Sequence, residues 1–137
     1  MSLLSTKGAY GLMSICEISK GDQKNPVSLN DISKNIGVSR NYLEQVLNTL
    51  RNSGFVSSIK GFRGGYYLVK TLDEITFYDI FNALENDFCL TSIKMENSSY
   101  DIFFKEYNEK LIELFSKPLS SFEDYQNQAK KYLNYVI

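Results

Sequence analysis

The sequence predicts a mainly α-helical protein with a helix-turn-helix, one two-stranded β-hairpin and a long C-terminal helix. Three observations support this fold class. A serine or threonine capping pattern occurs three times, all eight glycines lie within the first 65 residues, and apolar residues recur at helical spacing in the second half. Serine and threonine oxygens accept hydrogen bonds from free backbone N–H groups at helix starts, and glycines permit tight turns. We therefore expect the turns in the first half and long helices in the second.

The first expected helix runs from about Thr6 to Ser19, with Ser5 as its N-cap. Apolar side chains recur along one side of this segment at the spacing of an amphipathic helix. Cys16 belongs to this apolar stripe, so we expect it in the core. A polar loop, GDQKNP, separates this helix from the next.

Two short helices are expected over about 29–36 and 40–52, with Ser28 and Ser39 as their N-caps. In both, a valine before the cap faces an apolar residue in the first turns, which fixes the angle at which the chain enters the helix. Only the residues GVS at 37–39 separate the two helices. A short turn with glycine between two short helices is typical of a helix-turn-helix.

The next segment, VSSIKGFRGGYYLVK at 56–70, has two apolar runs on either side of the tip KGFRGG. This pattern predicts a β-hairpin with strands over about 55–59 and 66–69. A hairpin directly after a helix-turn-helix makes a winged helix, in which the hairpin is the wing. We expect the tip glycines to let its backbone approach another surface closely.

Three further helices are expected, over about 77–85, 100–116 and 121–133, the first of them with Thr76 as N-cap and Asp79 three residues on. The long helix carries apolar residues at steps of three and four, together with neighbours that widen the stripe. A helix this apolar outside the compact first half needs a partner.

The long helix is therefore predicted to form a symmetric dimer, and the alternative is that it folds back onto its own domain. The candidate dimerisation residues are Phe103, Phe104, Tyr107, Leu111, Leu114 and Phe115. Residues 1–85 would form a winged-helix DNA-binding domain, and residues 86–137 a helical dimerisation and C-terminal region.

The charge is distributed unevenly along the chain, although the net charge is only −1. Residues 1–70 carry nine Lys and Arg against four Asp and Glu, a net charge of +5, and residues 71–137 carry −6. A basic first half suits a polyanion such as DNA, and random scatter of charges is the alternative.

DNA contacts are expected from the start of the first helix, from the helix over 40–52 and from the wing. The candidates are Thr6, Lys7, Tyr10, Ser28, Ser39, Arg40, Asn41, Tyr42, Glu44, Gln45, Lys60, Gly61, Arg63, Gly64, Gly65 and Tyr66. In the major groove, Arg pairs with guanine, Asn and Gln pair with adenine, and Glu accepts from cytosine. Cations on a wing suit phosphates or a narrow minor groove.

Three of these assignments leave an alternative open. Glu44 either binds a base or forms an ion pair within its helix or on the surface. Lys7 either contacts a phosphate or is an ordinary solvated lysine. Phe62, at the tip of the wing, packs either on DNA sugars or on its own hairpin.

Three stretches resemble one known family: STKGAYGL at 5–12, VSLNDISKNIGVSRNYLEQVLNTLRNSGFVSSIKGFRGGYYL at 27–68, and ITFYDIFNALE at 75–85. They are similar to the IscR/NsrR/CymR family, which are small dimeric bacterial winged-helix transcription regulators. The resemblance covers about the first 85 residues strongly. It implies repression at promoter operators.

Several members of that family sense through an iron–sulfur cluster, which is held by three cysteines after the fourth helix and by a histidine or an N-terminal carboxylate. Here only Cys89 lies in that region, the chain has no histidine, and Ala9 stands near the acid of some relatives. A cluster normally needs about four ligands, so we expect no cluster and no cofactor. Cys89 is then either a redox-sensitive thiol or a small, partly buried apolar side chain.

Among members without a cluster, the chain most resembles the repressors of cysteine metabolism. In that system the resemblance implies a cysteine synthase partner that recognises chain ends terminating in isoleucine. The sequence ends Tyr135-Val136-Ile137, so Ile137 is a candidate to insert into the synthase active site, with O-acetylserine as its competitor. The alternative is an ordinary helix end that finishes on apolar residues.

The sequence thus predicts a dimeric DNA-binding regulator, a repressor of cysteine and sulfur metabolism genes, without an iron–sulfur cluster. The alternatives are a thiol- or effector-sensing member of the family with other targets, and a winged helix that acts as a protein–protein adaptor. No catalytic constellation is present, so we expect no enzyme. The N-terminus lacks a signal-peptide pattern and no apolar stretch reaches 18 residues, which favours the cytoplasm.

Overall fold

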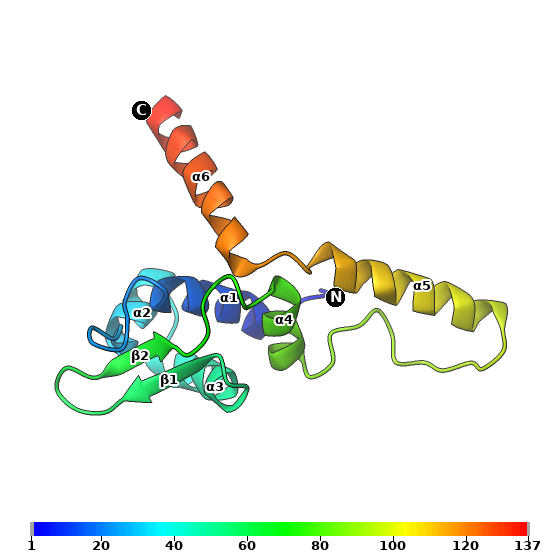
Figure 1. Ribbon diagram of the computed structural model, residues 1–137, viewed down its shortest axis with the longest axis horizontal. Helices are drawn as coiled ribbons and strands as arrows, with labels where there is room; N and C mark the ends of the chain where they lie inside the picture. Colours follow the sequence, from blue (N-terminus) through cyan, green and yellow to red (C-terminus); the bar gives the residue numbers. More distant parts are fainter. Residues whose placement is uncertain (1, 137) are drawn as a thin grey trace.

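The computed structural model describes residues 2–136, with the backbone alone at Tyr135 and Val136. The elements follow in the order α1 (Thr6–Ile18), α2 (Leu29–Ile36), α3 (Arg40–Asn52), β1 (Val56–Ile59), β2 (Gly65–Leu68), α4 (Phe77–Glu85), α5 (Ser99–Leu114), the 3₁₀ turn η1 (Leu119–Phe122) and α6 (Glu123–Val136). The first four helices and the hairpin form one body, from which α5 and α6 extend (Figure 1). The predicted fold class is confirmed.

The predicted helix starts are also confirmed, because each predicted cap makes its hydrogen bond. The backbone N–H of Asp31 donates to Ser28 Oγ at 3.1 Å, and that of Tyr42 donates to Ser39 Oγ at 3.3 Å. At α4, Thr76 and Asp79 exchange two such bonds, each 3.0 Å long, and so complete a capping box. These local bonds satisfy backbone groups that a helix start leaves free.

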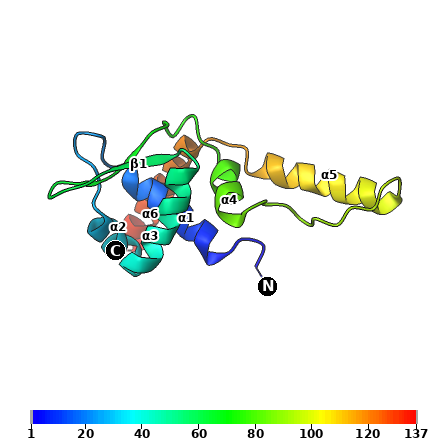
Figure 2. The same cartoon turned by 90° about the horizontal axis from the view of Figure 1, so that it is seen from below.

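Helix α1 lies at the centre of the body, in contact with α2, α3 and α4 (Figure 2). Its residues Ile15 and Ile18 are fully buried, and so is Ile32 of α2. Helix α3 adds the largest share of the core, through Leu43, Val46, Leu47 and Leu50. This packing leaves the opposite face of α3 free.

The wing is an antiparallel pair in which Val56 lies opposite Leu68 and Ile59 lies opposite Gly65. The strand β2 also pairs with the residue before the cap of α2. The N–H of Val27 donates to the oxygen of Tyr66 at 2.9 Å, and the N–H of Tyr66 donates back at 2.8 Å. The wing is therefore attached to the helix-turn-helix at its base.

The segment after α4 extends away from the body beside α5, and α5 then leads the chain back to the body (Figure 1). Phe88, just after α4, and Leu119, after α5, are both buried in the core. The N–H of Leu119 donates to the oxygen of Ile75 at 2.7 Å. The last helix begins at Glu123, after the 3₁₀ turn, two residues later than expected. The domain boundary between residues 85 and 86 stays a prediction, although residues on both sides of it share one core. Within the described part of the chain, every helix is too short or too polar to cross a membrane.

Candidate nucleic-acid interface

Helix α3 has one buried face and one free face. Its predicted contact residues Ser39, Arg40, Asn41, Glu44 and Gln45 are all exposed. Leucine and valine side chains on the opposite face lie in the core and hold the helix in place. The free face therefore presents donors and acceptors of several kinds on a fixed support, as side-chain contacts to base edges require.

The start of α1 lies against the first turn of α3. The oxygens of Thr6 and Tyr42 are 3.4 Å apart, and the rings of Tyr10 and Tyr42 meet edge to face with centroids 5.9 Å apart. Thr6 is exposed, whereas Lys7 and Tyr42 are partly buried. The structure thus joins two of the three predicted contact segments.

The third predicted segment, the wing, presents Lys60 and Arg63 to solvent. Phe62 stands between them with a relative exposure of 102%. Phe62 therefore makes no packing contact with its own hairpin, and this alternative from the sequence is wrong.

The conformation and packing of the wing itself explain two of its glycines, which the sequence does not show. Gly61 has a φ of +114°, which other residues rarely adopt. At Gly65, a Cβ atom would collide with the backbone of Val27, where β2 meets the start of α2. Gly65 thus permits a close approach within the protein, and the approach of the tip glycines to another surface stays a prediction.

A side chain that sequence reasoning missed links α3 to the wing. The guanidinium of Arg51 donates to Ser58 Oγ of β1 at 3.2 Å and to Asn48 Oδ1 at 2.8 Å. Burial raises the pKa of the nearby Tyr66 hydroxyl above its usual value; the charge of Glu44 also raises it, and that of Arg51 opposes the shift. Tyr66 therefore keeps its proton, and remains a hydrogen-bond donor, at neutral pH.

A second missed side chain, Glu85, lies at the end of α4 and reaches the N-cap of α1. The Ser5 N–H and the Ser5 hydroxyl both donate to Glu85 Oε1, at 2.9 Å and 2.6 Å. The two residues are 80 positions apart, so no local sequence signal indicates this contact.

The remaining predicted residues divide into several groups. The hydroxyls of Ser28 and Ser39 serve as helix caps. Of the candidate dimerisation residues, Phe103, Tyr107 and Leu114 are exposed and Phe104 is partly buried, whereas Leu111 and Phe115 pack against the core of their own body. Ile137 and the side chains of Tyr135 and Val136 lie outside the described residues.

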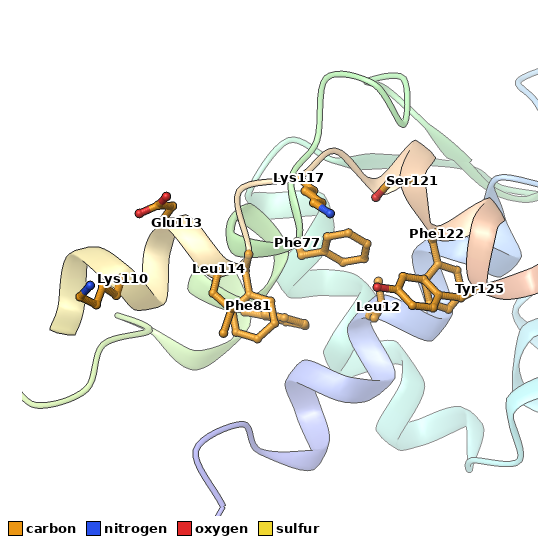
Figure 3. A pocket seen from close by; sticks show the side chains of 11 residues that line it. Leu12, Phe77, Phe81, Lys110, Glu113, Leu114, Lys117, Ser121, Phe122 and Tyr125 are labelled. Atoms are coloured by element: carbon orange, nitrogen blue, oxygen red, sulfur yellow. The ribbon is translucent and has the colours of Figure 1, made fainter.

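An apolar groove of about 790 Å³ lies between α1, α4, the end of α5 and the start of α6. Figure 3 shows the rings of Phe77, Phe122 and Tyr125 beside it, with Lys117 at one edge. The ring centroids of Phe77 and Phe122 are 6.3 Å apart, and those of Phe122 and Tyr125 are 5.8 Å apart. The groove continues the apolar surface of α5 onto the body.

The fold and this surface define a winged-helix protein of the transcriptional-regulator class. A family model named Rrf2, described as an iron-dependent transcriptional regulator, matches residues 4–130. The chain belongs to the Rrf2 family.

Two curated relatives confirm the family resemblance that the sequence suggested. The HTH-type transcriptional regulator CymR of Bacillus subtilis (strain 168) is 45% identical over 82 residues, which are 60% of this chain and 59% of that protein. The regulator IscR of Photorhabdus laumondii is 39% identical over 82 residues, 60% of this chain and 50% of that protein. The match thus spans between half and three fifths of the length of these relatives. Both are regulators and not enzymes.

Solved structures agree over a longer stretch. The structure of CymR (YrzC), the global cysteine regulator of B. subtilis, has a TM-score of 0.77 at 33% identity and covers 91% of this chain and 98% of that chain. The T. potens IscR structure has a TM-score of 0.75 at 30% identity, over 92% of this chain and 89% of that chain.

The family description names iron, but the residues of this chain do not fit an iron–sulfur cluster. The sequence has two cysteines and no histidine. Cys16 lies on α1 and Cys89 in the segment after α4, both partly buried, so the expectation that Cys16 lies in the core is wrong. Among the described residues, no three His, Cys, Asp or Glu side chains gather as a metal site, whereas a cluster needs about four ligands.

The two thiols are expected to differ in reactivity, because only the thiolate is nucleophilic. Burial raises the pKa of Cys16 to about 11; the charge of Glu17 also raises it, and Lys20 opposes the shift. At pH 8 about one Cys16 side chain in a thousand would be ionised. Iodoacetamide should therefore modify Cys89 well before Cys16, and the Cys16 rate should rise about tenfold per pH unit until pH approaches 11.

Peptide mass spectrometry after timed alkylation measures both rates. The urea-unfolded protein serves as the control, in which the two thiols should react alike. Equal rates in the folded protein would contradict the expectation that Cys16 is the less reactive thiol.

Proposed function

We propose that the chain is a sequence-specific DNA-binding regulator that inserts α3 into the major groove. The observation that carries this proposal is the free face of α3. The helix itself is fixed in place by its packing against α1 and the wing. Arg40, Asn41 and Gln45 on this face have the chemistry to pair with base edges. Glu44 is exposed beside them, and in a field of phosphates a carboxylate is favourable only where it accepts from a base such as cytosine.

The flanking segments suit the DNA backbone. Thr6 and Lys7 at the start of α1 are placed for phosphates, and such contacts fix the register of the protein on the duplex. On the wing, Lys60 and Arg63 suit the negative potential of a minor groove. Phe62 between them has no protein partner on its hairpin, so we assign it to the sugars of that groove.

We further propose that two copies form a symmetric dimer through α5 and the apolar groove. Phe103, Tyr107 and Leu114 are 52%, 44% and 68% exposed, and the groove extends this surface onto α1 and α4. An apolar surface of this extent on a monomer marks an interaction site. A two-fold dimer would also place two α3 helices on half-sites about one helical turn apart, about 34–36 Å.

We propose genes of cysteine and sulfur metabolism as the targets, under repression. The similarity to CymR supports this proposal, since that protein is the global cysteine regulator of B. subtilis. The chain also lacks the donor set that a cluster-dependent regulator needs. The contact of Tyr135, Val136 and Ile137 with cysteine synthase stays a prediction from the sequence. The cytoplasm is the expected location for such a regulator.

Binding to duplex DNA should weaken steadily as salt rises, because each phosphate contact releases counterions. Lys60→Ala should reduce the steepness of this dependence by about one unit in a plot of log affinity against log salt. Lys105→Ala, on the distant α5, is the matched control and should leave the slope unchanged. Fluorescence anisotropy of a labelled duplex measures both. A protein that ignores all duplexes in dilute buffer, or an unchanged slope for Lys60→Ala, would reject this interface.

Sedimentation should give the mass of two chains for the wild type. Phe103→Glu should shift the population to single chains, because a carboxylate would be buried without a partner in the apolar interface. Phe62→Glu offers a control, since it places the same charge on a fully exposed phenylalanine of the wing, away from α5. Dimers that persist in Phe103→Glu, or dissociation in Phe62→Glu, would refute α5 as the interface.

Mapping of occupied sites in the source organism by chromatin immunoprecipitation should recover promoters of sulfur-metabolism genes. The variant Arg40→Ala, expressed at the same level, is the control and should lose those sites because it lacks a base contact. Enrichment at iron–sulfur assembly promoters instead would overturn the proposed targets while leaving the DNA-binding function intact.

A further inference from the structure

We propose that Glu85 is a positioning residue for DNA binding, whose carboxylate holds the first turn of α1 where Thr6 and Lys7 meet the phosphate backbone. The inference rests on the DNA-binding function proposed above. It adds a residue that lies on α4, outside the three segments that would contact the duplex.

The geometry centres on one oxygen atom. Glu85 Oε1 accepts from the N–H of Ser5 at 2.9 Å and from its hydroxyl at 2.6 Å. Ser5 is at the same time the N-cap of α1, and its oxygen accepts from the N–H of Gly8 at 3.4 Å. Hydrogen bonds to a carboxylate are short and strong, and a negative charge near a helix N-terminus is favourable. Glu85 thus fixes the residue that caps α1.

The packing around this contact is close. A Cβ atom at Gly8 would lie 2.6 Å from Glu85 Oε1 and 2.5 Å from Leu4 Cδ1, so a larger residue there would displace the ends of these two side chains. The carboxylate therefore lies directly over the first turn of α1. The two residues that follow Ser5 are Thr6 and Lys7, both placed for phosphate contact.

Glu85 is itself held on a rigid support. Its neighbour Leu84 is 6% exposed, and Phe88, three residues further on, is 3% exposed. The N–H of Phe88 donates to Asn82 Oδ1 at 3.0 Å, and its ring lies against Phe81 with centroids 5.6 Å apart. The backbone of Glu85 is thus anchored on both sides by buried neighbours.

The sign of the mutational effect separates positioning from plain electrostatics. Removal of a negative charge near the duplex would by itself strengthen binding. If Glu85 acts by positioning, Glu85→Ala should instead weaken binding about tenfold and lower the salt slope by about one unit, as the loss of one phosphate contact does. Glu85→Gln keeps an oxygen that accepts from Ser5 and should retain most of the affinity.

A double-mutant cycle on the full-length protein tests the route through α1, with duplex affinity and salt slope as readouts. Lys7→Ala should cost little further affinity in the Glu85→Ala background, because coupled residues are not additive. Arg63→Ala, on the wing, should cost as much in that background as in the wild type. Thermal unfolding checks that each variant is folded, and Glu85→Asp, whose shorter side chain withdraws the carboxylate from Ser5, replaces Glu85→Ala in the cycle if the alanine variant is not.

Each outcome decides one question. A wild type that binds no duplex rejects the DNA-binding function. If the wild type binds, then unchanged or tighter binding by Glu85→Ala overturns the inference about Glu85. Full additivity with Lys7→Ala, or a Lys7→Ala variant with normal affinity and slope, overturns it as well.

Discussion

The burial of α1 among α2, α3 and α4 is the constraint on which the rest of the structure depends. Ile15 and Ile18 lose all contact with solvent there, and the helices around them are thereby fixed relative to one another. Because α3 gives its apolar face to this core, its polar face must lie outward. The same core places the first turn of α1 beside α3, through Thr6 and Tyr42. One apolar cluster thus determines the arrangement of the whole polar surface.

The C-terminal part of the chain, in contrast, leaves many of its apolar side chains exposed. On α5, the side chains of Ile102, Phe103 and Leu114 are more than half exposed, and on α6 so are Tyr132 and Leu133. Water disfavours apolar area of this extent by about 25 cal/mol per Å². The charge divides at an earlier point of the chain, since residues 1–70 carry a net +5 and residues 71–137 carry −6. A duplex would therefore attract residues 1–70, the segment that carries the free face of α3 and the wing.

Local chemistry explains how much of this fold the sequence predicts. Caps such as Ser28, Ser39 and Thr76 act within three residues, so helix starts were predictable, as was the glycine-rich hairpin. The contacts that assemble the candidate surface span the chain instead. Arg51 reaches the wing, and Glu85 reaches a cap 80 residues away. An apolar stripe on α5 also does not reveal that Phe115 turns inward to lie 5.2 Å from Phe81, between ring centroids, while Phe103 stays exposed.

The end of α4 connects these two parts of the molecule. Asn86 ends α4 in the left-handed conformation that asparagine tolerates, with a φ of +62°, and Asp87 follows with a φ of +105°. The next residue, Phe88, is buried and lies against Phe115 at the end of α5, with 5.9 Å between ring centroids. On the other side of this joint, Glu85 holds the cap of α1. Glu85 and Phe88 thus link the first turn of α1 to the end of α5 through one short segment of the chain.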